Sequence, residues 1–167
     1  MIVTAFQKSD LWYGKAIMPI IAAVENAELT ISRSGCRYLV EINRNGHVIQ
    51  IIPKKGTPQP RIKTKAPTWG FNFTSRERDF LARMVNSDQT VFLCLVCGEK
   101  ALYVLKGNAA IDAMTPGMVK PQMALSVQLK NGMYYMMSPN TRRIPIRPSS
   151  RSAFMTRLFQ QSNNNSL

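Results

Sequence analysis

A hairpin signal near the middle of the chain constrains the fold more than any other feature of the sequence. Residues 38–42 (YLVEI) and 48–52 (VIQII) are rich in β-branched side chains, and Asn45-Gly46 lies between them. An Asn-Gly pair readily supplies the positive φ angles that a tight hairpin turn requires. The sequence therefore predicts two antiparallel strands here, and the neighbouring segments are interpreted by how they can join this pair.

A basic segment follows the predicted hairpin. Pro53 lacks an amide donor and is expected to end the second strand, and residues 54–65 contain no acidic side chain. Pro58, Pro60 and Pro67 favour an extended backbone, which would hold the positive charges along a line that suits a phosphate backbone. A solvated loop is the alternative interpretation. The candidate nucleic-acid contacts in this segment are Lys54, Lys55, Arg61, Lys63 and Lys65.

The remaining patterns predict an α+β fold. Thr74-Ser75-Arg76-Glu77 fits a capping box at the start of a helix. The predicted architecture is a mixed, mostly antiparallel sheet with two flanking helices and a C-terminal β-hairpin extension. Residues 1–159 are expected to form one globular domain and residues 160–167 a disordered polar tail. The predicted elements are, in order, a helix from residue 11 to about Asn26, strands at 29–32, 38–42 and 48–52, a helix at 75–85, strands at 89–97 and 101–105, a short helix at 109–114, a hairpin of 124–129 and 133–137 across Asn131-Gly132, and a short helix at 153–159.

The charge balance indicates a polyanionic partner. The 167 residues include 22 Lys and Arg against 9 Asp and Glu, which gives a formal net charge of +13. Nucleic acid, either DNA or RNA, is the expected partner, and a membrane surface is the competing polyanion. The sequence contains no apolar run of spanning length, no signal-peptide layout at the N-terminus and only three cysteines. These features predict a cytoplasmic protein with free thiols and no membrane partner.

Further cations enlarge the predicted nucleic-acid surface. No acidic residue follows Asp112, so the C-terminal arginines form a second source of positive field. Arg76 and Arg83 lie two turns apart on one face of the predicted second helix. Trp69 begins an alternating aromatic run and is a candidate for stacking on bases, with core packing as the alternative. These additional nucleic-acid-binding candidates are Trp69, Arg76, Arg83, Arg142, Arg143, Arg147 and Arg151.

The order of elements between about residues 14 and 105 resembles the core of the PD-(D/E)XK nuclease superfamily. Gly14 matches a glycine that precedes the first helix in that core, and Tyr38-Leu39-Val40 matches its strand motif with Leu39 in the place of an aspartate. On the next strand, Gln50-Ile51-Ile52 keeps a glutamine without the following lysine. The alternative register, Ile52-Pro53-Lys54, keeps the lysine without the acid.

The resemblance implies a site in which two acids hold a divalent metal and a lysine stabilises charge at the reacting phosphate. Because Leu39 replaces the first acid, we expect a degenerate nuclease-like core with no cofactor and no catalysis. An active Mg²⁺-dependent nuclease is the alternative. It would use Glu41 as the replacement metal ligand, Glu25 or Glu28 as the second ligand, and Lys54 as the lysine.

Cys94-Leu95-Val96-Cys97 resembles one half of a zinc knuckle, and Cys36 with His47 could nominally complete the ligand set. A second Cys-x-x-Cys is absent, however, and thiols three residues apart in a strand point to opposite faces. We therefore expect buried structural cysteines, no bound zinc and a surface position for His47.

The favoured function is a basic, non-catalytic nucleic-acid-binding protein. The alternative from a different class is an interaction protein, for instance a small phage or mobile-element factor that docks on a nucleoprotein complex. Its basic surface would then contact the RNA or DNA bound in that complex.

Overall fold

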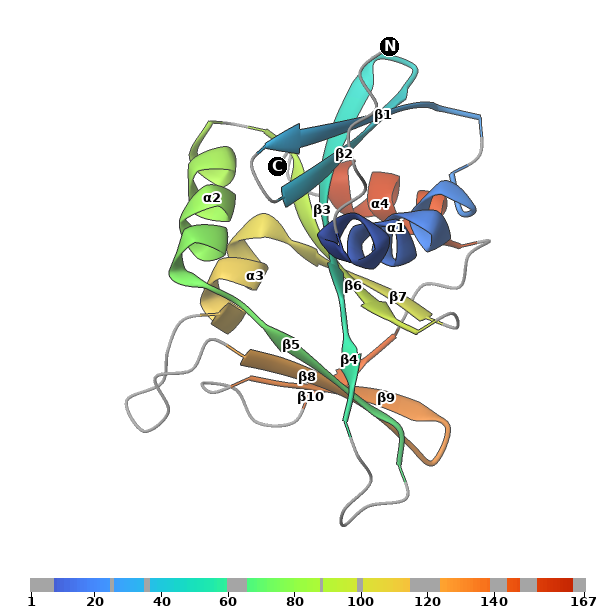
Figure 1. Ribbon diagram of the computed structural model, residues 1–167. Coiled ribbons are helices and arrows are strands. Elements are labelled where there is room, and N and C mark those ends of the chain that lie inside the picture. Colours follow the sequence, from blue (N-terminus) through green and yellow to red (C-terminus); the bar gives the residue numbers. More distant parts are fainter. Residues whose placement is uncertain are drawn as a thin grey trace.

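The structure, a computed structural model, describes residues 8–24, 26–34, 37–59, 66–87, 89–98, 101–114, 124–138, 144–147 and 153–163. Four helices and two five-stranded sheets form in these ranges (Figure 1), which confirms the predicted α+β class. The helices are α1 (Lys8–Ile21), α2 (Ser75–Asn86), α3 (Gly107–Met114) and α4 (Phe154–Asn163). α4 therefore includes the first residues of the predicted polar tail.

Sheet A contains the predicted central hairpin. Its strand order is β1-β2-β3-β6-β7, and all neighbours are antiparallel except β3 and β6, which run parallel across the connection that contains α2. Asn45 (φ 54°) and Gly46 (φ 80°) form the turn between β2 and β3, as predicted. The strands are β1 (Glu28–Ser34), β2 (Arg37–Arg44), β3 (His47–Lys55), β6 (Val91–Cys97) and β7 (Ala101–Lys106).

Pro53 does not end β3, contrary to the prediction, and the strand continues to Lys55. The amides of Gln50 and Gly56 donate to carbonyls in or beside β6 at 2.9 Å, so amides of even-numbered residues face β6. The nitrogen of Pro53 therefore faces the β2 side, where pairing has already stopped at Ile51. A missing donor costs little at that position, because no ladder bond is required there.

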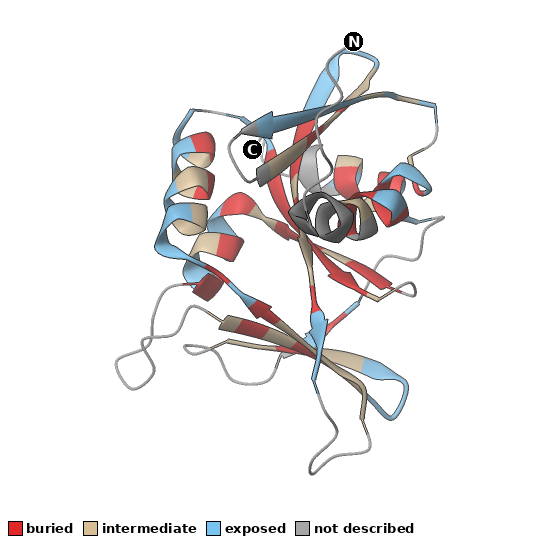
Figure 2. Ribbon diagram, in the orientation of Figure 1, coloured by how far each residue is buried: buried red, intermediate tan, exposed pale blue. Residues whose placement is uncertain are grey.

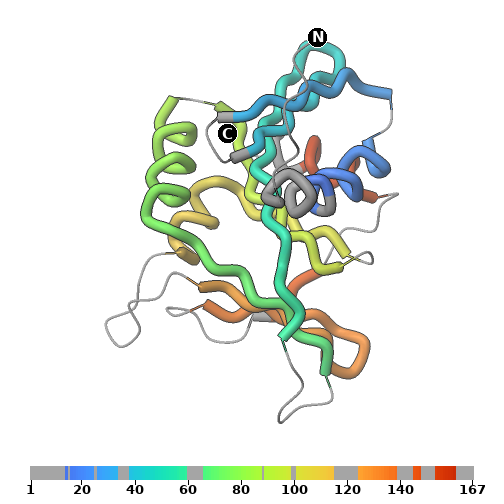
Figure 3. The backbone as a smooth tube through the Cα atoms, viewed as in Figure 1, coloured from blue at the N-terminus to red at the C-terminus, as the bar shows by residue number. Residues whose placement is uncertain are grey.

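The predicted C-terminal hairpin belongs to a second sheet, sheet B, with strand order β10-β9-β8-β5-β4. The chain leaves β3, passes Gly56, adds β4 to sheet B, and then returns through β5 to α2 (Figure 3). The strands are β4 (Thr57–Pro58), β5 (Thr68–Asn72), β8 (Ala124–Lys130), β9 (Met133–Met137) and β10 (Ile144–Ile146). All neighbours in sheet B are antiparallel.

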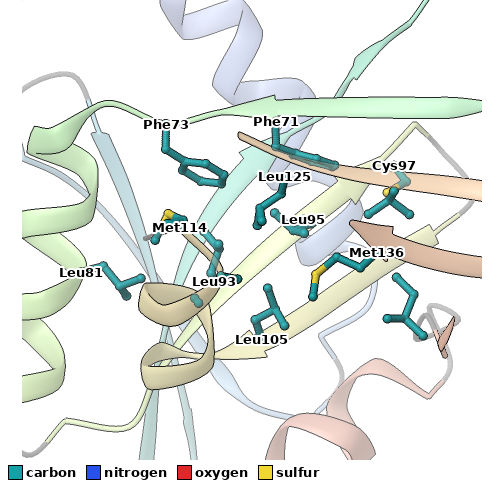
Figure 4. Close-up of a cluster of buried hydrophobic side chains, with 14 of the residues drawn as sticks. Phe71, Phe73, Leu81, Leu93, Leu95, Cys97, Leu105, Met114, Leu125 and Met136 are labelled. Atoms are coloured by element: carbon teal, nitrogen blue, oxygen red, sulfur yellow. The ribbon is translucent and has the colours of Figure 1, made fainter. Parts of the chain in front are cut away.

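Two apolar cores lie on opposite faces of sheet A. One joins sheet A to α1 and α4 and includes Ile20, Ile42, Ile51, Phe92 and Phe154. The other joins it to α2, α3 and sheet B and includes Leu81, Leu93, Leu95, Met114, Phe71 and Leu125 (Figure 4). β6 contributes to both cores, which explains why it is buried over its whole length, as predicted from its apolar sequence (Figure 2).

The start of α2 follows a local sequence signal, whereas the end of α1 does not. α2 begins with the predicted capping box, in which the Thr74 side chain accepts from the Glu77 amide and the Glu77 carboxylate accepts from the Thr74 amide. α1, however, ends at Ile21 instead of near Asn26. The chain turns after Ile21, and Asn26 has a positive φ of 52°, which no α-helix can include.

Candidate functional site

The nuclease-like positions of the sequence meet on the face of sheet A that α2 packs against. Glu41 and Gln50 are direct partners in the β2–β3 register, and Gln50 Nε2 donates to Glu41 Oε2 at 3.3 Å. Gln50 is only 9% exposed. Leu39 and Ile52, which stand where the resemblance requires an acid and a lysine, pack against the apolar core on this face. The structure therefore brings one acid and one amide together, and Thr30 of β1 is paired with Glu41 on its other side.

Lys54 is too far along β3 to serve Glu41. It lies four residues beyond Gln50, which is about 13 Å at the ordinary rise of a strand. Its ammonium Nζ instead forms an ion pair with Glu77 Oε1 at 2.6 Å and lies 4.9 Å from the centre of the Phe73 ring. The ion pair joins the end of β3 to the first turn of α2. Its two side chains are each 21% exposed, so the contact is largely shielded from water.

Glu77 is held in its charged form by these contacts. Burial by itself raises the pKa of Glu77, but hydrogen bonds from the Lys54 ammonium and from Thr74 outweigh it and lower the pKa below its usual value. Lys54 is thus bound within the protein. Lys55, the other predicted contact at this point, is the last residue of β3 and half-buried.

Glu28, one of the two candidates for a second metal ligand, is hydrogen-bonded to Asn43. Glu28 begins β1 opposite Asn43, whose side-chain amide donates to the Glu28 carboxylate at 3.3 Å. Within the ranges that the structure describes, no three His, Cys, Asp or Glu side chains gather closely enough to hold a metal ion. Glu25 lies outside those ranges.

The cysteines of β6 follow the strand interpretation. Cys94 belongs to the core beside α1 and α4, and Cys97 belongs to the core on the opposite face. Burial raises the pKa of the Cys94 thiol, with a smaller contribution from Cys97, and burial raises the pKa of Cys97 to about 12. The two thiols cannot ligate one ion together. His47 is exposed at the hairpin turn, as predicted, and Cys36 lies outside the described residues.

The aromatic run that begins in β5 and ends at Phe73 faces the core. Trp69, Phe71 and Phe73 share one face, as their alternation predicts, but Phe71 is fully buried and Phe73 nearly so. Trp69 packs against the same core, and its ring stacks on Tyr134 with centroids 6.4 Å apart and an interplanar angle of 23°. The core-packing alternative therefore describes all three rings, and Trp69 is a poor candidate for stacking on bases.

One end of sheet B collects the cationic segments. Lys130 ends β8 beside the turn to β9, and Arg147 follows β10 directly at the same end, because Ile146 pairs with Tyr134 near that turn. Both side chains are exposed. The flanks of segment 60–65 are fixed there as well, by hydrogen bonds of 2.9 Å from Gln59 N to Thr68 O and from Leu129 N to Pro67 O. Segment 60–65 lies outside the described residues and carries Arg61, Lys63 and Lys65. We call Lys130, Arg147 and segment 60–65 the basic end.

Of the predicted C-terminal arginines, Arg147 is the one that the described residues include. The connection between β9 and β10 starts after Met137 and returns at Ile144, at the opposite end of the sheet from the β8–β9 turn. Arg142 and Arg143 lie in that connection, and Arg151 follows Arg147; all three are outside the described residues.

Arg76 and Arg83 form a separate surface. Both are exposed on α2, and the exposed acidic Asp79 lies between them at helical spacing, which partly offsets their charge. They are two turns apart, as predicted, but their helix packs beside α3 rather than at the basic end.

Sequence reasoning missed the outer face of sheet B, which is the face turned away from sheet A and the helices (Figure 1). Residues on it alternate with the buried Phe71, Leu125, Val127 and Met136, and none of the outer side chains is buried. The available signal was the period-two pattern of β8 and β9, in which every second residue is polar or only partly buried. The outer face includes Thr57, Thr68, Asn72, Ser126, Gln128, Tyr135 and Pro145.

No family model, no curated protein and no solved structure matches this chain. Its resemblance to the nuclease superfamily therefore stays a prediction from element order and motif. In the part of the chain that the structure describes, none of the helices combines the length and apolar character needed to cross a bilayer.

Proposed function

We propose that this protein binds nucleic acid without cutting it and that the basic end of sheet B is its main phosphate contact. The observation that carries the proposal is topological. Strand pairing places two exposed cations, Lys130 and Arg147, at one end of sheet B. Both flanks of segment 60–65, whose sequence contains three further cations, are fixed at the same end. Two exposed cations beside the fixed flanks of a segment whose sequence carries three more suit a polyanion with regularly spaced charges.

The absence of opposing charge supports the same proposal. The five strands of sheet B contain Lys130 and no acidic residue. Sheet A, in contrast, carries Glu28 and Glu41, and α2 carries Glu77 and Asp79. A net charge of +13 is thus distributed so that phosphate meets little repulsion along sheet B.

The partners of Glu41 and Lys54 in sheet A support binding without cleavage. Phosphodiester hydrolysis by a divalent metal needs ligands that hold the ion beside the scissile phosphate. Glu41 has a neutral amide beside it, and Lys54 is bound to Glu77. The order α1, β1–β3, α2, β6, with β6 parallel to β3, is compatible with a nuclease-like core that has lost its metal site.

Salt dependence of binding tests the proposal. Each phosphate contact contributes about 0.9 to the slope of log K against log salt for a duplex and about 0.7 for a single strand. We expect Lys130→Ala/Arg147→Ala to flatten the slope by roughly 1.5 units. Arg61→Ala/Lys63→Ala/Lys65→Ala should flatten it by roughly 2–3 units if all three side chains contact phosphate.

A charge-matched variant provides the control. Arg76→Ala/Arg83→Ala removes two exposed arginines from α2 and should leave the slope nearly unchanged. If this variant flattens the slope and the two basic-end variants do not, α2 is the phosphate contact and the proposal is wrong. Absence of binding by the wild-type protein at low salt would contradict nucleic-acid binding altogether.

A further inference from the structure

We infer that the ligand is single-stranded nucleic acid and that the outer face of sheet B receives its bases. This inference rests on the proposed function, because it assigns the ligand class to the surface beside the basic end. It concerns different side chains, however, and a different kind of contact.

The outer face presents a continuous row of side chains across four strands. Thr68 of β5 pairs with Gln128 of β8, Gln128 pairs with Tyr135 of β9, and Tyr135 pairs with Pro145 of β10. Gln128 Nε2 lies 3.5 Å from Thr68 Oγ1. Directly paired side chains on one face of a sheet lie next to one another, so the tyrosine ring has a hydroxyl and an amide on one side and a proline on the other.

This row has the chemistry that unpaired bases require. An aromatic ring offers a stacking surface to any base, and amide and hydroxyl groups donate to and accept from base edges. Tyr135 is partly exposed, and its hydroxyl donates to the sulfur of the exposed Met133 at 3.9 Å. Ser126 adds a hydrogen-bonding group one step along the strands, and Asn72 adds another one step further.

The distance to the basic end fits one strand that crosses both surfaces. Gln128 is two residues from Lys130, and Pro145 is two residues from Arg147, so the row lies about 7 Å from the end of the sheet. A nucleotide whose base stacks on Tyr135 can therefore place its phosphate toward the cations. The charge complementarity described above holds for this face, since no acidic residue occurs in its strands.

A duplex does not fit this arrangement equally well. Base pairs in a duplex show only their edges, in grooves that admit a helix or a two-stranded ribbon. Sheet B has five strands, about 19 Å across at the ordinary strand spacing, and a face of that width cannot enter a major groove of about 12 Å. Exposed base faces occur in single strands, and flat sheets with aromatic side chains stack them.

Fluorescence anisotropy with a labelled 12-nucleotide single strand and a hairpin duplex tests the inference. We expect the single strand to bind more tightly at the same salt concentration. Tyr135→Leu keeps an apolar side chain but removes the ring, and it should weaken single-strand binding about 5- to 150-fold without changing the salt slope. Tyr135→Phe keeps the ring and should bind the single strand almost as well as the wild type. Thermal melts would verify that both variants fold.

The outcomes separate this inference from the proposed function. If the duplex binds as tightly as the single strand, or Tyr135→Leu binds like the wild type, the inference is wrong. In that case the proposed function still stands if the basic-end variants flatten the salt slope. If the wild type binds neither ligand, both are wrong. If the wild type is a dimer in sedimentation, and Tyr135→Leu is a monomer that binds the single strand with unchanged affinity, a second copy of the chain occupies this face. The inference is then overturned.

Photo-cross-linking gives a measurement that needs no variant. An oligonucleotide with 5-iodouridine should cross-link to the peptide that contains Tyr135, as identified by mass spectrometry. Cross-links confined to β1 and β2 would instead place the bases on sheet A and overturn the inference.

Discussion

Lys54 and Glu77 give the sharpest test of the geometry, because the same lysine was predicted from the sequence to contact nucleic acid. Lys54→Met removes the charge but keeps an unbranched apolar side chain of nearly the same length beside the Phe73 ring. Glu77→Gln keeps an acceptor for the capping box and removes the opposite charge. The two single variants and the double variant together form a thermodynamic cycle.

The expected coupling follows from burial and distance. At the Nζ–Oε1 separation of 2.6 Å and an effective dielectric constant of about 20, the gross attraction is about 6 kcal/mol, and desolvation offsets much of it. Exposed pairs contribute about 0.2–1 kcal/mol, whereas breaking a buried pair costs about 3–5 kcal/mol. Each partner is 21% exposed, so we expect a coupling of about 1–2 kcal/mol. In a chain of this size that corresponds to a Tm change of about 2–8 °C.

Urea unfolding at several pH values measures the coupling. The pKa of Glu77 is lowered in the folded protein, so its stabilising contribution is complete above the unfolded pKa of about 4.3. The contribution decreases as the pH falls from there through the lowered pKa. The stability advantage of the wild type over Glu77→Gln should therefore be constant near pH 7 and disappear in acid.

Two results would refute this reasoning. A coupling below about 0.3 kcal/mol at pH 7 would mean that the ion pair is no stronger than an exposed one. A Lys54→Met variant of normal stability that flattens the salt slope of nucleic-acid binding would return Lys54 to the binding surface. We expect instead a less stable protein with an unchanged slope.

Three further predictions concern the buried cores and Glu41 of sheet A. In a Cys36→Ser background, Cys94 and Cys97 should not react with a thiol reagent at pH 8 until urea unfolds the chain, because burial raises both pKa values; rapid reaction in the native state would contradict their placement. Gly56→Ala should lower the free energy of unfolding by about 1–3 kcal/mol in urea titrations, since an added Cβ would lie 2.7 Å from a buried ring of β5. Incubation with Mg²⁺ or Mn²⁺ should leave labelled DNA and RNA intact on gels; cleavage that Glu41→Ala abolishes would establish the nuclease alternative.

The parts of the fold that the sequence predicts are those determined by neighbouring residues. Asn45-Gly46 and Asn131-Gly132 adopt the positive φ angles that a hairpin turn requires. The capping box at Thr74 and the uninterrupted apolar run of β6 are also local signals. Each of these elements forms where the pattern places it.

The parts that the sequence does not predict depend on distant residues. β5 joins sheet B through pairs such as Asn72 with Ala124, and no local pattern specifies that partner. The same pairing determines which face of β5 is covered, so alternation alone could not show that Trp69 packs inward. Lys54 and Glu77 are 23 residues apart, and their contact depends on how α2 packs against β3.

The separation in sequence between β5 and β8 also has a consequence for the order of folding. The hairpins β2–β3 and β8–β9 close across two residues, on a timescale of about 1–10 μs for an isolated hairpin. Pairing β5 with β8, by contrast, must close a loop of roughly fifty residues and lose its chain entropy before the new contacts form. We therefore expect sheet B to be completed late, so that the nascent chain acquires its basic end only after most of sheet A is in place.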